Sequence, residues 1–167
     1  SMGWTVRALV RDAEGARKSG LDATELYEGE ATNPLTLCGA MDDVDLVIST
    51  LGITRQRDGL SYWDVDYQAN ANLLVDALAA GVDRFAYVHV LNAHKMQDIP
   101  LVAAKQAFAD RLQASPIKST VIAPSGFHSD MGDFLNMAES GRIFLFGSGN
   151  LKLNPIDGAD LAEVLAS

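Results

Sequence analysis

The stretch Asp45-Leu46-Val47-Ile48-Ser49-Thr50-Leu51-Gly52 decides the fold of this chain. Its apolar residues are almost continuous, and Val44 extends the run at its start. Such a run is typical of a strand that is buried on both faces of a parallel sheet, because a strand with one solvent-facing side alternates apolar and polar residues instead. We therefore predict a buried strand within residues 44–51, ended by Gly52.

Strand-like and helix-like segments alternate on both sides of this run. The helical segments are expected at residues 13–19, 34–41, 63–80, 100–114, 131–139 and from 159 onward. The further strands are expected at residues 6–10, 25–27, 85–91, 119–123 and 142–146. Strands that alternate with helices at this spacing indicate βαβ units, so the predicted fold class is α/β with a doubly wound parallel sheet.

Composition narrows the classes of function. At 167 residues the chain has the size of a single domain, residues 1–167. A formal net charge of −9 disfavours a nucleic-acid partner, because the phosphate backbone is itself negative. The sequence has neither an apolar run of the ~18–20 residues that a membrane span needs nor a signal peptide, so we expect no membrane partner and a cytoplasmic location.

A metal site is not expected from the sequence. The single Cys38 excludes an internal disulfide and any all-cysteine metal site. His89, His94 and His128 lie apart in the sequence and do not have the spacing of metal ligands on a helix.

Several segments, taken in their order and spacing, carry a resemblance to a known family. They are Val6-Arg7-Ala8-Leu9-Val10-Arg11-Asp12, Asp45 to Gly52, Asp66-Tyr67-Gln68-Ala69-Asn70, Arg84-Phe85-Ala86-Tyr87-Val88, Ala104-Lys105-Gln106-Ala107-Phe108, Thr120-Val121-Ile122-Ala123-Pro124 and Asn154-Pro155-Ile156. The chain resembles the atypical short-chain dehydrogenase/reductase group, particularly its NmrA-like and NAD(P)H-binding members. This resemblance implies a Rossmann-like fold that binds a small-molecule dinucleotide, NADP.

One part of the family pattern is missing from this sequence. Members of the family begin with a strand and a glycine-rich turn of the G-x-x-G-x-x-G kind, whose glycines let the backbone approach the cofactor's pyrophosphate. No such motif occurs here, so we expect a domain that is incomplete at its N-terminus and also shortened at its C-terminus. Because that strand is central in the family's sheet, its absence would leave two neighbouring strands without a partner. Another chain or a homo-oligomer would then have to supply it.

The resemblance assigns cofactor contacts to three places. Arg11 would contact the adenosine 2′-phosphate, which selects NADP over NAD, because a guanidinium matches phosphate in geometry and charge. Ser49-Thr50-Leu51-Gly52 would lie beside the adenine ribose and the linking phosphates, and Glu30 close to the adenine. The alternatives are a solvated arginine at a strand end for Arg11, a structural turn for residues 49–52 and a solvated turn for Glu30.

The candidate catalytic residues lie further along the chain. In the wider family a tyrosine four residues before the equivalent of Lys105 exchanges the proton, but Leu101 stands there in this sequence. Lys105 would still contact the nicotinamide ribose, and His89 is the remaining candidate acid or base. The backbone of Pro124 and Ser125 would face the nicotinamide carboxamide. The alternatives are a lysine on a helix surface and a histidine at a strand end whose hydrogen bonds are satisfied within the protein.

Three functions remain open on the sequence alone. The first is an NADPH-dependent oxidoreductase for a small carbonyl or quinone-like substrate, and the second is a non-catalytic dinucleotide sensor or scaffold. The third is a fragment that cannot bind the cofactor, because the pyrophosphate turn is missing. Helix 63–80 is also a candidate interface between copies. Buried positions are predicted for Trp4, Trp63, Leu73, Leu74, Ala77 and Leu78.

Overall fold

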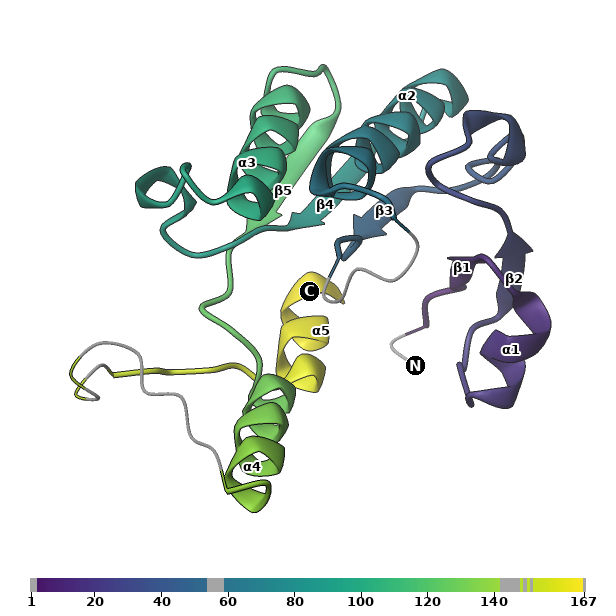
Figure 1. The fold of residues 1–167 in the computed structure, drawn as a ribbon. Helices are drawn as coiled ribbons and strands as arrows, with labels where there is room; N and C mark the ends of the chain where they lie inside the picture. Colours follow the sequence, from purple (N-terminus) through teal and green to yellow (C-terminus); the bar gives the residue numbers. More distant parts are fainter. Residues whose placement is uncertain (1–2, 54–58, 142–147, 149, 151, 167) are drawn as a thin grey trace.

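Two parallel sheets carry the fold in the computed structural model, which describes residues 3–53, 59–141, 148, 150 and 152–166. The first sheet pairs β1 (Arg7–Val10) with β2 (Glu25–Glu28). The second has the order β3 (Leu46–Ser49), β4 (Arg84–Val88) and β5 (Lys118–Ile122), as Figure 1 shows. The predicted parallel α/β architecture is confirmed, whereas the strand predicted at 142–146 lies outside the described residues.

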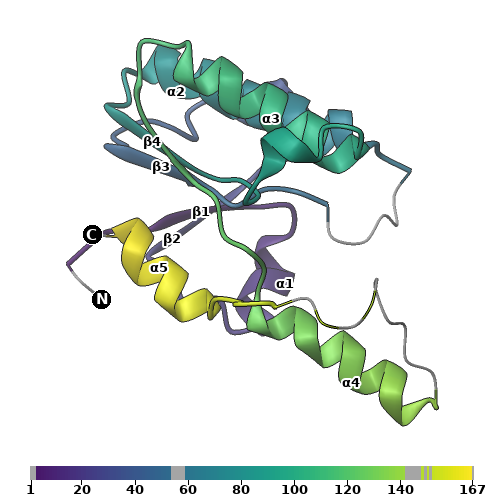
Figure 2. The same ribbon diagram turned by 90° about the vertical axis from the view of Figure 1, so that its left-hand side faces the viewer.

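Helices lie on both sides of the strands. They are α1 (Ala13–Lys18), α2 (Asn70–Ala80), α3 (Pro100–Gln113), α4 (Met131–Glu139) and α5 (Gly158–Ala166). Figure 2 shows α2 and α3 over one face of β3 and β4, with α5 on the opposite side together with α1 and α4. This two-sided cover is the doubly wound arrangement that the sequence predicts.

Local sequence signals explain where the helices begin and end. The Asp12 side chain accepts a hydrogen bond of 2.9 Å from the Gly15 amide at the start of α1. Pro100 opens α3, where the missing amide proton costs nothing. Gly81 ends α2 with a φ of 77°, in the left-handed region that glycine adopts without strain. The helix α2 therefore stops where the chain turns toward β4.

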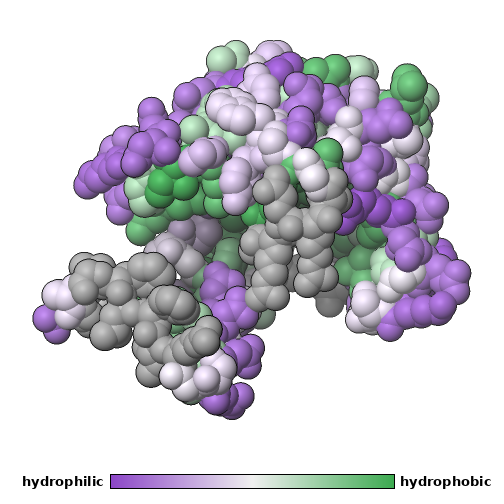
Figure 3. Space-filling model, in the orientation of Figure 1, coloured by the Kyte–Doolittle hydropathy of each residue, from purple (hydrophilic) through white to green (hydrophobic). Residues whose placement is uncertain are grey.

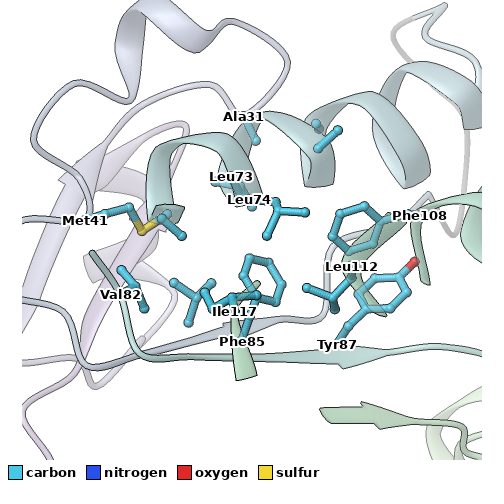
Figure 4. Close-up of a cluster of buried hydrophobic side chains, with 14 of the residues drawn as sticks. Ala31, Met41, Leu73, Leu74, Val82, Phe85, Tyr87, Phe108, Leu112 and Ile117 are labelled. Carbon is cyan, nitrogen blue, oxygen red and sulfur yellow. The ribbon is translucent and has the colours of Figure 1, made fainter. Parts of the chain in front are cut away.

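The core lies between β4 and the helices α2 and α3 (Figure 4). Phe85 and Tyr87 on β4 point at Phe108 on α3, with ring centroids 6.0 and 4.7 Å apart. Leu74 from α2 and Leu112 from α3 fill the space around the rings, and all five side chains are buried. This packing fixes α3, and with it Lys105, over the carboxyl end of the second sheet.

Two of the sequence predictions about packing are wrong. Residues 34–41 form only a short 3-10 helix, Pro34–Thr36, followed by turns. Gly39 has a φ of 84°, which an α-helix cannot include. Trp4 and Trp63 are 43% and 48% exposed rather than buried, although the stripe on α2 is buried except for Leu78.

The facing edges of the two sheets lack a partner. Among the described strands, β1 pairs only with β2, and β3 pairs only with β4. Ile48, in the middle of the predicted two-sided strand, is 43% exposed, and Val6 beside β1 is 48% exposed. Within the described residues, β1 and β3 therefore each have a pairing strand on one side.

The described part of the chain contains neither a membrane-spanning helix nor a cluster of metal ligands. No helix there combines the length and the apolar character needed to cross a membrane. Nor do those residues bring three or more His, Cys, Asp or Glu side chains together in a way that could hold a metal ion.

Candidate cofactor site

A cavity of about 1760 Å³ lies between the two sheets and is lined by residues of β1 and β3. The sequence-predicted cofactor residues Arg11, Glu30 and Ser49 to Gly52 all line it. His89, Lys105, Pro124 and Ser125 do not. Ligand pockets commonly measure ~300–1,000 Å³, so this cavity has room for a dinucleotide and more.

The first part of the site is formed by the ends of β1 and β2. Arg11 directly follows β1 and is exposed, and Glu30 lies two residues after β2. A Cβ at Gly29 would come 2.8 Å from the Thr36 carbonyl oxygen, so the turn packs too closely for a side chain. Glu30 itself is held in this turn, since its amide donates to Thr36 Oγ1 at 2.8 Å. The parallel strands thus deliver a cation and a carboxylate to one rim of the cavity.

The second part of the site is the end of β3, which Asn70 holds in place. The buried Ser49 hydroxyl donates to Oδ1 of the Asn70 side chain, so the Ser49 side chain is already bonded inside the protein. Nδ2 of the Asn70 side chain donates to the backbone oxygens of Leu51 and Asp66 at 3.4 and 3.0 Å. The backbone of Ser49, the exposed Thr50, and Leu51 and Gly52 line the cavity and could contact a ligand there.

Lys105 lies directly behind this strand end and is paired with a buried carboxylate. Its Nζ is 3.1 Å from Asp66 Oδ1 and 3.4 Å from the Leu51 carbonyl oxygen. The Asp66 side chain is completely buried, and the Lys105 side chain is 12% exposed. Asp66 lies in η2, a π-helical segment (Trp63–Ala69) that leads into α2. Segments of this kind often occur at functional sites.

Gly52 allows the close approach of these charged groups. A Cβ at this position would come 2.5 Å from Asp66 Oδ1 and 2.7 Å from Lys105 Nζ. The Asp66 Oδ2 atom also accepts from the Ile53 amide at 3.2 Å. The ion pair therefore supports the loop that forms the rim of the cavity, even though Lys105 does not line it.

His89 is the first of three hydrogen-bonded side chains, and this arrangement fixes its tautomer. The Asp110 carboxylate can only accept hydrogen bonds, so the Gln106 atom that faces it at 2.8 Å is the side-chain nitrogen Nε2. The Gln106 carbonyl oxygen therefore faces His89 Nε2 at 3.0 Å, and that nitrogen must carry the proton. Nδ1 of His89 is buried, and no described residue is its hydrogen-bond partner. Burial lowers the pKa of His89, and the Lys105 cation contributes in the same direction.

Tyr87 is the second buried polar side chain near Lys105. Its ring stacks on His89 with centroids 6.0 Å apart, and Lys105 Nζ lies 5.4 Å from its centroid. Its hydroxyl is buried and meets no hydrogen-bond partner among the described residues. Burial, and then the Asp66 carboxylate, raises the pKa of Tyr87 above its usual range, so the phenol stays protonated.

The sequence reasoning named Lys105 and His89 but missed the roles of Asp66, Tyr87 and Gln106. A signal for Asp66 was present. Asp66, Ala69, Asn70 and Leu73 follow the i, i+3, i+4, i+7 pattern of the buried helix face. An aspartate in that phase must be buried and therefore needs a cationic partner.

Pro124 and Ser125 lie in the segment that follows β5. The Ser125 hydroxyl donates to the Asn154 carbonyl oxygen, and Phe127 forms an isolated parallel bridge with Ile156. The sequence-predicted site residues therefore fall into three groups: those at the rim of the cavity, Lys105 on α3 with His89 directly after β4, and this segment.

The residues present fit a dinucleotide at the rim of the cavity. Arg11 offers a cation for a phosphate, and residues 49–52 line the cavity at the carboxyl end of a parallel strand. Ligands of open α/β sheets bind beyond these ends, where the strand order reverses.

The chain is similar in sequence to curated proteins and in fold to solved structures. Photosystem II assembly factor Ycf39 of Guillardia theta is 28% identical over 163 residues, which are 96% of this chain and 51% of that protein. The structure of Citrobacter sp. triphenylmethane reductase complexed with NADP(H) superposes with a TM-score of 0.73 at 20% identity, over 96% of this chain and 54% of that one. An Escherichia coli NADPH-dependent quinone oxidoreductase, complexed with NADPH, gives 0.61 at 22% identity, over 83% of this chain and 46% of that one.

The chain spans about half the length of the curated relatives it matches. At these identities the likeness to the solved structures concerns the fold alone. The family comparison goes further, because the model of the NAD(P)H-binding family matches residues 1–167. Together with the parallel sheets and the site at their carboxyl ends, this match shows that the chain belongs to the NAD(P)H-binding family.

Proposed function

We propose that the chain is the dinucleotide-binding part of an NADPH-dependent oxidoreductase that acts on a small carbonyl or quinone-like substrate. The observation that carries the proposal is the convergence of Arg11, Glu30 and residues 49–52 on one cavity. The oxidoreductase activity extends the family membership by analogy with the triphenylmethane and quinone reductases, whose folds are similar.

Arg11 supports a preference for NADP. It lies at the carboxyl end of β1, next to the β2 end that carries Glu30. A guanidinium there would bind the adenosine 2′-phosphate through two parallel hydrogen bonds. The Glu30 carboxylate would lie near the adenine, and residues 49–52 beside the ribose and the linking phosphates.

The reducing half of the site would be organised by Lys105. Bound NADPH would supply a hydride to the acceptor. Lys105 would hold the nicotinamide ribose, oriented by its pairing with Asp66. The backbone of Pro124 and Ser125 would face the carboxamide. The reduced acceptor would take its proton from water, because the proton on His89 Nε2 is held by Gln106 and the neutral ring carries none on Nδ1.

A dinucleotide sensor or scaffold is the second candidate function, and a specific observation favours it. Leu101 occupies the position of the proton-donating tyrosine, and the lowered pKa keeps His89 neutral and without a spare proton at neutral pH. The relatives described as photosystem II assembly factors are not named for a reaction. Tight binding without turnover would be the signature of this function.

Calorimetric titration of the chain with NADPH and NADH tests the binding. We expect NADPH to bind more tightly, and Arg11→Gln to remove that preference. Losing one charge-assisted contact of about 1.5–3 kcal/mol corresponds to roughly 10- to 150-fold in Kd. Arg17→Gln is the matched control, because Arg17 is exposed on α1 and does not line the cavity. Failure of both nucleotides to bind would refute the proposal and leave the fragment hypothesis.

Turnover separates the two candidate functions. NADPH oxidation would be followed by absorbance with a panel of small aldehydes, ketones and quinones. Steady oxidation that Lys105→Met abolishes would support the reductase. Binding of NADPH with no oxidation across the panel would favour the sensor.

A further inference from the structure

On the basis of the function proposed above, we propose that Asp12 and Glu28 are positioning residues that set the preference for NADP over NAD. Their carboxylates cap the first turn of α1, and these caps hold the turn after β1 so that Arg11 faces the cavity and Asp12 does not. The preference for NADP then depends on two acidic residues as well as on the arginine that contacts the phosphate.

Both signs of charge occur where β1 and β2 end. Arg11 and Asp12 come directly after β1, and Glu28 is the last residue of β2, opposite Val10 in the strand register. The Gly29 amide donates to the Val10 carbonyl oxygen at 2.9 Å, which holds the two strand ends side by side. In dinucleotide-binding folds a carboxylate near such a strand end binds the ribose 2′-hydroxyl of NAD, whereas an arginine binds the 2′-phosphate of NADP. The choice of cofactor therefore depends on which of these side chains faces the ligand.

The two carboxylates are bound by amides of the first turn of α1. Asp12 Oδ1 accepts from the Gly15 amide at 2.9 Å, and Glu28 Oε2 accepts from the Ala13 amide at 3.0 Å. The first amides of a helix have no partner within the helix itself. A hydrogen bond from such an amide to a carboxylate is also stronger than one between neutral groups. Both carboxylates are therefore held at the start of α1.

The lining of the cavity separates the arginine from the two carboxylates. Arg11 lines the cavity, whereas the adjacent Asp12 and the opposite Glu28 do not. Because Glu28 belongs to β2 and bonds to the Ala13 amide, it ties the turn of residues 11–13 to the neighbouring strand. Without this bond the turn could change its dihedral angles, and Arg11 would spend less time at the rim.

Gly15 provides the space for the Asp12 cap. A Cβ at position 15 would collide with Asp12 Oδ2. That oxygen is the end of a flexible side chain, so the Asp12 carboxylate would leave the cap at little cost. It would then compete with the 2′-phosphate for the Arg11 guanidinium next to it. Alanine is also the better helix former, so Gly15→Ala releases Asp12 while part of the lost capping energy is offset.

The caps lie at the surface, which makes them suitable for substitution. Asp12 and Glu28 are both exposed. Figure 3 shows mainly hydrophilic side chains over the part of the surface where Figure 1 places α1. Changes at these two positions therefore leave the hydrophobic core between β4, α2 and α3 intact.

Calorimetric titration with NADPH and with NADH gives the ratio of the two Kd values for each variant. Glu28→Ala should reduce the preference for NADPH about tenfold, because the bond to the Ala13 amide is lost. Gly15→Ala should reduce it in the same direction. Glu28→Gln should keep or raise the preference, since its side-chain oxygen can still accept from Ala13 and a negative charge near the phosphate is removed.

Two controls separate positioning from a general effect on the fold. Glu14 lies in the same turn of α1, pairs with Lys18 and is 77% exposed, so Glu14→Ala should leave the ratio unchanged. In an Arg11→Gln background, Glu28→Ala should change the ratio no further, because the Glu28 cap acts through Arg11. A residue that only stabilises the fold would weaken the binding of both nucleotides by the same factor.

The outcomes distinguish this inference from the proposed function. If the parent prefers NADPH and a folded Glu28→Ala variant keeps that preference, the caps have no role and the proposed function stands. An equal loss in Glu28→Gln would also overturn the inference, because the cap would then not be what matters. If Glu28→Ala does not fold, an unchanged ratio in Gly15→Ala would overturn it instead. A parent chain that binds neither nucleotide would refute the proposed function and the inference together.

Discussion

Replacing Asp66 by asparagine tests whether burial makes the Asp66–Lys105 ion pair important for the stability of the fold. The two side chains lie 3.1 Å apart, and their exposed fractions are 0% and 12%. Asparagine keeps the shape of the side chain and can still accept from the Ile53 amide, which now bonds to Asp66 Oδ2. The change therefore isolates the carboxylate charge beside Lys105.

A surface pair at the same separation provides the comparison. Lys118 and Asp83 lie 3.0 Å apart with side chains 72% and 66% exposed. Coulomb's law gives about 1.4 kcal/mol for such a pair in water and about 5 kcal/mol for the Asp66 pair at an effective dielectric of about 20. Breaking a buried pair from one side costs about 3–5 kcal/mol, because the remaining charge is left uncompensated. An exposed pair contributes less than about 1 kcal/mol.

Urea unfolding at pH 7 provides the assay. We expect Asp66→Asn to lower the free energy of unfolding by about 3–5 kcal/mol and Asp83→Asn by less than about 1 kcal/mol. If Asp66→Asn does not fold, adding Lys105→Met should restore folding, because the double variant leaves no buried charge unpaired. Equal small losses in the two single variants would refute the argument that burial distinguishes the pairs.

Three further variants test neighbouring features. Gly52→Ala should destabilise the chain by about 1–3 kcal/mol in thermal unfolding, because a Cβ there meets Asp66 Oδ1 at 2.5 Å, whereas Gly132→Ala, with open space, should not. Burial, and then the Asp42 carboxylate, raises the pKa of Asp76. The free energy that this carboxylate costs the folded state therefore grows as pH rises above its usual pKa of 3.8. We expect Asp76→Asn to be more stable than the parent chain at pH 7 but not at pH 3. Because the pKa of His89 is lowered in the folded chain, the unfolded chain binds a proton first as pH falls below the usual value of 6.5. The parent chain should therefore lose stability between pH 7.5 and 5.5, and His89→Gln should lose less. Urea unfolding midpoints at the two pH values measure this difference.

The strands β1, β3 and β4 were predictable because each lies within a short, dense apolar run. The run 44–51 correctly predicts β3 (Leu46–Ser49), but not the 43% exposure of Ile48. Hydrophobicity reports the environment that a residue suits, whereas exposure depends on which neighbours are present. The disagreement at Ile48 therefore marks the edge at which β3 has no partner.

Two errors arose from apparent helical spacing. Leu37, Ala40 and Met41 are buried and have the i, i+3, i+4 pattern of a helix, yet the chain turns at Gly39 with a positive φ. The prediction at residues 63–80 placed Trp63 in the core, but the buried face of η2 is that of Asp66 and Ala69. The prediction for Trp63 relied on its aromatic character, whereas the spacing of the buried helix face predicts burial at Asp66 and Ala69 instead.

In the candidate site, the residues suited to binding the dinucleotide and those suited to proton exchange lie at different strands. The features suited to phosphate and adenosine, Arg11 and residues 49–52, lie at the rim of the cavity between β1 and β3. The groups suited to proton exchange lie on β4 and α3, where the Tyr87 hydroxyl is buried and the raised pKa of Tyr87 keeps it protonated, while the Nε2 proton of His89 is held by Gln106. Changes at the rim should therefore alter nucleotide affinity, and changes around Lys105 should alter turnover. A chain with an intact rim and a blocked proton path would bind the dinucleotide without using it, which is why affinity and turnover must be measured separately.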